Sequence, residues 1–492
     1  MKKLYLSLVL CLGLAFVSGC SGSVGSPYHS PWDLAQPADE RRAAVESSNA
    51  EQLKPQVDWR DQNNIRHDIE RTTTYDNRKS LEVIDVEGAT SQQQRQVKQQ
   101  VRPSSTKVKV AFLAPMSGPH EAIGNALFNA AQLALFDVGS ENFELIPRDT
   151  KGTPNGAQEA ARSALQSGAD LILGPLLSDS VSAVKPVAAT RDVPVVAFST
   201  DWRVAGNRTY IMGFLPYAQV ARVTNYALAQ GYDQISIFAP QGPYSDQVQR
   251  TLSYTLSRAG QRIAKKKVFS PHQNDLETIL SEFVEFERRQ AEMDEIKAEL
   301  QMRVDTLDDK AAKEELKRLS RRKATSELPF NAMMIPLGGQ GLKTVSSFLG
   351  HFEVDTNKVK LLGTGLWDDA TLTKEPVLHR SWFAAADPGL RSGFLKNYED
   401  AYGQKPPRLA SLGYDATALA AILAQNSNGL MPSQVYSHDR LTSERGFAGI
   451  DGIFRFRSDG LVERGLAVLE IRPDKIIVID PAPSAFLGPR KS

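Results

Sequence analysis

The chain has 492 residues, of which 41% are hydrophobic and 23% are charged, and its formal net charge is +1. Such a balance, with charges interspersed and no basic stripe, gives no indication of nucleic-acid binding. The two cysteines, Cys11 and Cys20, leave no candidate for a disulfide or a cysteine metal site in the chain after position 20.

The N-terminus, residues 1–19, has the pattern of a secretory signal peptide. Two lysines precede an apolar run at 4–17, which is shorter than the ~20 residues that a membrane-spanning helix needs. The run ends in Val17-Ser18-Gly19-Cys20, which resembles the lipobox of bacterial lipoproteins and implies lipidation of Cys20. An ordinary secretory signal with an incidental cysteine is the alternative. The resemblance further implies an outer-membrane address, because Ser21 rather than aspartate follows the cysteine.

Residues 20–106 are predicted to be a lipid anchor followed by a disordered tether. Serine, glutamine, proline, asparagine and mixed charges dominate this segment, and apolar periodicity is absent. A flexible chain of about 86 residues has a root-mean-square span of ~50 Å. The tether would therefore carry a domain from a membrane towards the cell-wall layer.

From residue 107 to residue 485, short apolar strands alternate with amphipathic helices. Strands are predicted at 108–114, 143–147, 171–173, 195–198, 235–239, 267–269, 332–335, 360–362 and 382–385, and helices at, among others, 122–137, 156–167, 178–189, 216–230 and 410–424. Such alternation predicts an α/β fold with parallel sheets, and about 385 residues exceed one core, so two lobes are expected. Three final strands, at 453–457, 466–471 and 476–479, predict a small antiparallel addition.

The segment 284–327 predicts an inserted helical hairpin. Apolar residues recur there with helical spacing, and the first arm carries Met293, Ile296, Leu300 and Leu307. Residues 277–309 hold eleven acids and four bases, whereas residues 310–327 hold seven bases and three acids. Opposite charges suit antiparallel arms that meet near 305–309. The four apolar residues are a candidate partner-binding stripe, and a solvated spur without function is the alternative.

Several strand-and-loop segments carry a family resemblance. Residues 110–119 (VAFLAPMSGP), Gly174-Pro175 with Ser178, and 194–200 (PVVAFST) resemble the leucine/isoleucine/valine-binding type of type I periplasmic binding proteins. Residues 361–369 (LLGTGLWDD) and 449–456 (GIDGIFRF) resemble the penicillin-binding-protein activator lipoproteins within that family. The resemblance implies two parallel-sheet lobes joined by three crossovers, near 214–217, 337–341 and 449–452. Lobe 1 would then comprise 107–216 and 340–450, and lobe 2 would comprise 217–339 and 451–485.

The resemblance also implies a ligand cleft between the lobes, at loops that follow the carboxyl ends of strands. The candidate ligand-binding residues are Ser117, Ser178, Ser199, Thr200, Tyr244, Gln273 and Asp368. Hydroxyl groups near a helix N-terminus suit a carboxylate, although Ser178 would equally serve as a helix cap and Tyr244 would equally pack locally. Gln273 aligns with the carboxylate that pairs with the ammonium group in amino-acid-binding members. A neutral amide binds an ammonium less strongly, so a free amino acid is not the expected ligand.

Sequence motifs argue against an enzyme. Ser182 to Lys185 and Ser320 to Lys323 match the Ser-x-x-Lys of penicillin-binding proteins, but no Lys-Thr-Gly element accompanies them. The seven histidines are scattered, so no metal or cofactor is expected. Two functions remain: a lipid-anchored regulator that binds a penicillin-binding protein or another peptidoglycan synthase, and the solute receptor of an ABC importer for amino acids or a related small anionic ligand.

Overall fold

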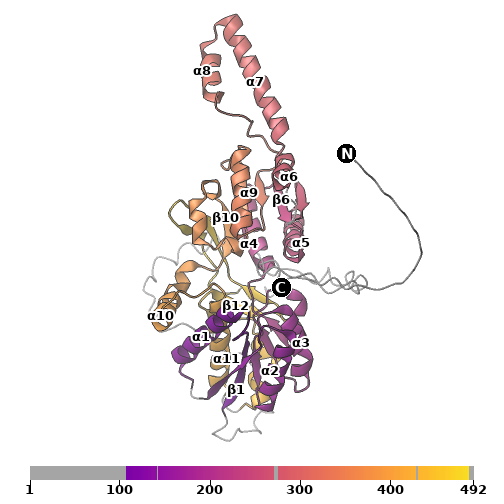
Figure 1. Cartoon of the computed structure of the whole chain (residues 1–492), viewed down its shortest axis with the longest axis vertical. Coiled ribbons are helices and arrows are strands. Elements are labelled where there is room, and N and C mark those ends of the chain that lie inside the picture. Colours follow the sequence, from indigo (N-terminus) through magenta and orange to yellow (C-terminus); the bar gives the residue numbers. More distant parts are fainter. Residues whose placement is uncertain (1–106, 141, 271–274, 428–429, 487–492) are drawn as a thin grey trace, which may run out of the picture.

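The computed structural model describes residues 107–140, 142–270, 275–427 and 430–486, which form two α/β lobes and a projecting helical spur (Figure 1). The predicted signal peptide, Cys20, the tether and Gln273 lie outside the described residues. Among the helices that the structure does describe, none combines the length and the apolar character needed to cross a membrane.

Lobe 1 is built on a five-stranded parallel sheet in the order β2-β1-β3-β4-β5. Its strands are β1 (Val108–Ala114), β2 (Phe143–Asp149), β3 (Leu171–Leu173), β4 (Val195–Ala197) and β5 (Thr209–Ile211). The central strands are apolar without alternation because helices cover both faces of the sheet. The helices of this lobe are α1 (Glu121–Val138), α2 (Pro154–Gln166), α3 (Ser178–Ala189) and α11 (Ala410–Gln425).

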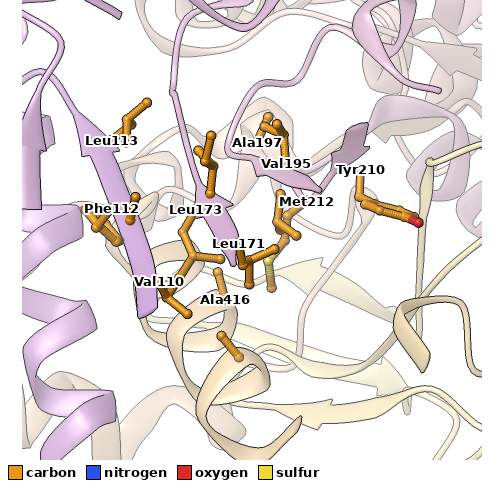
Figure 2. Packing of buried hydrophobic residues seen from close by; sticks show 14 of the residues in the cluster. Val110, Phe112, Leu113, Leu171, Leu173, Val195, Ala197, Tyr210, Met212 and Ala416 are labelled. Atoms are coloured by element: carbon orange, nitrogen blue, oxygen red, sulfur yellow. The ribbon is translucent and has the colours of Figure 1, made fainter. Parts of the chain in front are cut away.

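The core of lobe 1 joins strands to a helix that is distant in sequence. Figure 2 shows Val110, Phe112 and Leu171 from the sheet close to Ala416 of α11. Helix α11 also packs closely against α1, because a Cβ at Gly413 would lie 2.1 Å from the carbonyl oxygen of Leu127. A glycine is therefore required at this helix crossing.

Lobe 2 is built on a seven-stranded sheet in the order β15-β14-β10-β9-β8-β6-β7. Five strands are parallel: β6 (Ile235–Pro240), β7 (Lys266–Phe269), β8 (Ala332–Met334), β9 (Lys360–Gly363) and β10 (Trp382–Ala385). β14 (Ala467–Ile471) and β15 (Ile476–Asp480) form an antiparallel end, which confirms two of the three strands predicted for it. The predicted strand at 453–457 lies instead in a separate three-stranded sheet. The covering helices are α4 (Pro216–Ala229), α5 (Pro243–Arg258), α6 (Leu276–Phe283) and α9 (Gly339–His351).

The remaining elements are shorter. They include α10 (Ser392–Tyr402), α12 (Pro432–Val435) and α13 (His438–Leu441), and a three-stranded sheet of β11 (Phe447–Gly449), β12 (Gly452–Phe456) and β13 (Val462–Arg464). The 3-10 turns are η5 (Trp202–Val204), η6 (Gly365–Trp367), η7 (Ala370–Lys374), η8 (Pro376–Leu378) and η9 (Pro388–Arg391). Phe394 and Tyr398 of α10 pack with Ala126 of α1, so α10 belongs to lobe 1.

The structure corrects two of the three predicted crossings. β9 pairs with β8 and β10 pairs with β9 in the sheet of lobe 2, so the chain leaves lobe 2 after Ala385 and not near 337–341. Phe456 and Val462 lie in the core of lobe 1, so the last crossing follows Arg464 and not 449–452. Lobe 1 thus comprises about 107–215 and 388–464, and lobe 2 comprises about 216–387 and 465–486.

The predicted helical hairpin is confirmed. α7 (Phe286–Leu307) and α8 (Lys310–Leu319) form two arms of unequal length that project from lobe 2 (Figure 1). The turn lies at Asp308, which adopts a left-handed conformation, and Asp309, whose carboxylate accepts hydrogen bonds from the backbone of Ala311 and Ala312. We call residues 286–319 the spur.

Candidate functional site

Three of the predicted ligand-binding serines follow neighbouring strands of lobe 1. Ser117, Ser178 and Ser199 come after β1, β3 and β4, which are adjacent and parallel, so they share the carboxyl-end edge of the sheet. On lobe 2, Tyr244 lies in the first turn of α5, after β6. The two edges approach each other, because the guanidinium carbon of Arg250 in α5 lies 5.9 Å from the ring centre of Trp202 after β4.

The hydroxyl of Ser117 makes a hydrogen bond within lobe 1. It donates to Oδ2 of Asp149, at the end of β2, over 2.6 Å. Oδ1 of the same carboxylate accepts hydrogen bonds from the backbone N–H groups of Met116 and Lys151. Partial burial alone would raise the pKa of Asp149, but these hydrogen bonds hold it below its ordinary value. Asp149 is therefore a carboxylate that fixes the loop after β1.

The other candidate ligand-binding residues of lobe 1 are Ser178, Ser199 and Thr200, which differ in burial and in hydrogen bonding. Ser178 is the first residue of α3, whose N-cap is Leu177 and which has no side-chain cap. Ser199 is buried, and its Oγ accepts a hydrogen bond from the backbone N–H of Asp201 over 3.0 Å. Thr200 is exposed beside it. The capping role considered for Ser178 is thus not what the structure shows.

Tyr244 is joined to another strand end of lobe 2. Its hydroxyl donates to Oγ1 of Thr364, which follows β9, over 2.7 Å, and burial raises the pKa of Tyr244. The next residue, Gly365, donates its backbone N–H to Oε1 of Gln219 over 2.8 Å. These bonds connect α5, the loop after β9, and α4, so Tyr244 has a structural role at this edge of the sheet.

Asp368 lies in an ion-pair cluster and joins the lobes. Its Oδ2 accepts hydrogen bonds from Arg391 over 2.9 Å and from Arg408 over 3.1 Å. Arg391 lies in the second crossing, and Arg408 precedes α11 of lobe 1, whereas Asp368 follows the lobe 2 core residue Trp367. The carboxylate predicted to contact a ligand therefore links lobe 2 to lobe 1.

The same cluster continues into lobe 1 with fully buried charges. Asp451 pairs with Arg408 at 3.1 Å, and Asp415 of α11 lies 4.0 Å from Arg464 and accepts a hydrogen bond from the backbone of Ile450. Burial, followed by the negative charge of Asp451, raises the pKa of Asp415 to about 7. Burial alone would raise the pKa of Asp451 as well, but the arginines hold it below its ordinary value. We call this group the hinge cluster: Asp368, Arg391, Arg408, Asp415, Asp451 and Arg464.

The base of the spur is fixed by a buried arginine. Arg289 in the first turns of α7 is fully buried, and its guanidinium donates to the carbonyl oxygens of Val284, Thr325, Phe352 and Glu353 at 2.7–3.3 Å. Burial lowers the pKa of Arg289. Because these carbonyls belong to both ends of the insertion and to the end of α9, Arg289 sets the direction of the spur.

The structure places the four predicted partner-binding residues in two groups. Met293 and Leu300 are buried inside the spur, with 3% and 9% exposed, so neither is accessible to a partner. Ile296 and Leu307 are 39% and 72% exposed, and Met302, which the sequence prediction did not include, is 59% exposed. The accessible apolar surface of α7 is therefore Ile296, Met302 and Leu307.

The expected electrostatic pairing of the two arms is not observed in the spur. Arg303 of α7 pairs with Asp309 at the turn, and Lys297 donates to the carbonyl oxygen of Arg322, but the lysines of α8 are exposed. The buried side of α8 is formed by Ala312 and the half-buried Leu316 and Leu319. Apolar packing and capping hold the hairpin, and the lysines of α8 face solvent.

The Ser-x-x-Lys match in α3 lacks the geometry of a nucleophile and its base. The Ser182 hydroxyl donates to the carbonyl oxygen of Ser178, whereas Nζ of Lys185 donates to the carbonyl oxygens of Val204 and Ala205. Among the residues that the structure describes, no group of three His, Cys, Asp or Glu side chains is arranged to hold a metal ion.

Sequence reasoning did not select most of the residues that organise these regions. Asp149, Thr364, Arg289 and the arginines of the hinge cluster are ordinary polar residues in the sequence. Asp415 did carry a signal, because it is the one charged residue of α11, in which residues 410–424 are all buried. A charge in such a helix requires a partner.

Comparison with known proteins agrees with this architecture. Residues 107–287 match the family model described as periplasmic binding protein. An uncharacterised protein of Rickettsia prowazekii is 21% identical over 171 residues, which are 35% of this chain and 46% of that protein, so the chain spans about half the length of this curated relative.

Three solved structures share the fold at low sequence identity. A putative branched-chain amino acid ABC transporter protein from Rhodospirillum rubrum has a TM-score of 0.59 at 15% identity and covers 76% of this chain and 100% of its own. An ABC transporter substrate-binding protein from Sphaerobacter thermophilus has a TM-score of 0.57 at 16% identity, with 77% and 98% covered. The LpoA C-domain from Haemophilus influenzae, described as a regulator of PBP1A, has a TM-score of 0.52 at 14% identity, with 75% and 99% covered. The chain thus carries a domain with the type I periplasmic-binding-protein fold, and its residues 107–287 match that family.

Proposed function

We propose that this protein is a non-catalytic regulator of peptidoglycan synthesis, anchored through Cys20 to the outer membrane and facing the periplasm. Its partner would be a penicillin-binding protein, and the spur would make the contact. The anchor and tether rest on the sequence pattern of residues 1–106. The LpoA C-domain, a regulator of PBP1A with the same fold, supports this class of function.

The observation that carries the proposal is the exposed apolar surface of the spur. Ile296, Met302 and Leu307 are exposed on a helix that projects from lobe 2, while Arg289 holds the base of that helix rigid (Figure 1). Exposed apolar side chains along a projecting helix add nothing to the stability of the domain. Burial of these side chains against another protein would remove their apolar surface from water, which is favourable.

The strand-end residues support a binding function less well. The hydroxyls of Ser117 and Tyr244 donate to Asp149 and Thr364, and Asp368 is paired with two arginines. An anionic ligand, which needs these hydroxyls as donors, would have to displace these bonds, each of which contributes about 1 kcal/mol, and more where a charge takes part. This arrangement favours a regulator over a solute receptor.

The test is a pull-down of the full-length lipoprotein from detergent-solubilised envelopes, with penicillin-binding proteins detected by a fluorescent β-lactam. The variant carries Ile296→Asp, Met302→Asp and Leu307→Asp, which place charges on the spur without touching its buried side. The matched control is Phe136→Asp, because Phe136 is 85% exposed on α1 of lobe 1, away from the spur.

We expect the wild type and the Phe136→Asp variant to retain a labelled penicillin-binding protein and the spur variant to lose it. If all three proteins retain the labelled penicillin-binding protein equally, the spur does not make the contact. Absence of any labelled protein from the wild-type sample, with the lipoprotein itself recovered intact, would contradict the proposed partner class.

The second candidate function is a solute receptor of an ABC importer. It is favoured by the fold shared with substrate-binding proteins of ABC transporters. Native mass spectrometry of the purified protein would detect a retained small molecule, and release of a single defined ligand that rebinds stoichiometrically would favour the receptor.

A further inference from the structure

The hinge cluster lies where all three crossings of the chain meet. Asp368 comes from lobe 2, Arg391 from the second crossing, and Arg408 from the start of α11 in lobe 1. Arg464 ends β13 at the third crossing and donates to the carbonyl oxygen of Met212, just before the first crossing. Every connection between the lobes is therefore joined to one set of charges.

Aromatic and backbone contacts fill the space around these charges. The guanidinium carbons of Arg408 and Arg464 lie 4.0 Å and 4.9 Å from the ring centre of Phe214, in the first crossing. The Tyr217 hydroxyl donates to the carbonyl oxygen of Val462, which joins the first and third crossings. The void beside them, lined by Phe214 and Arg464, has a volume of about 10 Å³, which is no larger than one water molecule.

Rotation of one lobe against the other would separate charges that are largely shielded from water. The side chains of Asp368 and Arg391 are only 12% and 11% exposed, that of Arg408 is 27% exposed, and Asp451 is fully buried. Solvent screens such pairs only weakly, and a buried charge that loses its partner is strongly unfavourable. Rotation that moves Asp368 away from Arg391 and Arg408 would therefore be opposed by the loss of these ion pairs.

We infer that the hinge cluster locks lobe 1 and lobe 2 at one angle, so that the domain and its spur move as a single rigid body. In a receptor that closes around a solute, a crossing region must permit rotation. The bonds of Asp368 to Arg391 and Arg408 oppose that rotation here. The inference concerns the domain itself and does not depend on which partner the spur contacts.

The experiment measures the distance between spin labels on the two lobes by pulsed electron paramagnetic resonance. Labels are placed on cysteines introduced at Glu159 of α2 and Gln340 of α9, both exposed, in the full-length chain with Cys11→Ser and Cys20→Ser. The test variant is Asp368→Asn, which keeps the shape and removes the charge. The matched control is Asp369→Asn, because Asp369 only caps η7 through the backbone N–H of Thr371.

We expect one narrow distance distribution in the reference protein and in Asp369→Asn. Asp368→Asn should populate other lobe angles to an extent comparable with the locked one, giving a broader and displaced distribution. A broad or two-peaked distribution in the reference protein would overturn the lock, as would an unchanged distribution in a folded Asp368→Asn. If circular dichroism shows that Asp368→Asn does not fold, the distances are measured in Arg391→Gln instead. This variant keeps the pairing of Arg408 with Asp368 and Asp451, and the same two results would overturn the lock.

Discussion

Lys360 at the start of β9 gives a sharp prediction about stability and pH. Its side chain is almost fully buried, and its Nζ lies 4.3 Å from the ring centre of Trp382 and donates to the carbonyl oxygen of Arg380 over 2.8 Å. Burial lowers the pKa of Lys360 from 10.5 to about 8, although Glu470 partly opposes the shift. The perturbation is Lys360→Met, which keeps the length of the side chain and removes the titrating amine.

The direction in which stability changes with pH follows from the number of protons bound in the folded and unfolded states. Below about pH 8 the lysine is charged both folded and unfolded, and the folded state bears the full cost of burying the charge. Between about pH 8 and pH 10.5 the folded protein releases the proton that the unfolded chain keeps, so stability rises with pH. The difference between the two pKa values corresponds to about 3 kcal/mol. The wild type should therefore gain up to that amount over Lys360→Met from pH 7 to pH 11.

The assay is urea unfolding followed by tryptophan fluorescence at pH 7, 8.5 and 10. Comparison with Lys360→Met removes the contribution of every group that both proteins share. Lys358→Met is the matched control, because Lys358 is an exposed lysine that pairs with Glu327. A free-energy difference between wild type and Lys360→Met that stays constant over this pH range would refute the assignment of a lowered pKa to Lys360.

The remaining predictions concern the spur, the anchor and the ligand. Arg289→Met leaves buried carbonyl groups without donors, so the free energy of local unfolding of the spur should fall by about 3 kcal/mol. Amide hydrogen exchange should then be faster in α7 and α8 and unchanged in lobe 1. Cys20→Ser should release the intact protein from membranes, and wild-type fractionation of a variant whose signal has been cleaved would contradict lipid anchoring. The purified protein should not bind leucine, isoleucine or valine at micromolar concentration, because the family resemblance aligns the neutral Gln273 with the carboxylate that pairs with an ammonium group; tight stoichiometric binding in calorimetry would favour the importer function.

Local pattern was sufficient to predict the class of fold and most strands, but not the short strands β5, β11 and β13. Strands such as Leu171–Leu173 are apolar on both faces, and helices such as Ser178–Ala189 follow them at once, so alternation of parallel strands and helices is evident in the sequence. The hairpin was also predictable, because the helical spacing of 293–307 continues through a segment that has no strand. These features depend on which residues are buried within each element.

The lobe boundary depended on the tertiary structure. The strands Lys360–Gly363 and Trp382–Ala385 were predicted correctly, but they were assigned to lobe 1. The first pairs with Ala332–Met334 and the second pairs with the first, which places both in lobe 2. A buried strand has the same apolar sequence in either sheet. Its position is decided by which neighbouring edge accepts its hydrogen bonds, and that edge lies far away in the chain.

Side-chain partners were likewise decided by packing between distant segments. The charge pattern of 277–327 predicted pairing between the arms of the spur, but Ala312 and its apolar neighbours face α7, so the bases of α8 face solvent. Asp368 was predicted to bind a ligand, but its carboxylate accepts hydrogen bonds from Arg391 and Arg408, which are 23 and 40 residues away. The sequence by itself determined which residues are charged and which segments fold as strands and helices. Only the tertiary structure decided which charges meet, because removal from water and proximity across the hinge arise when the two lobes pack.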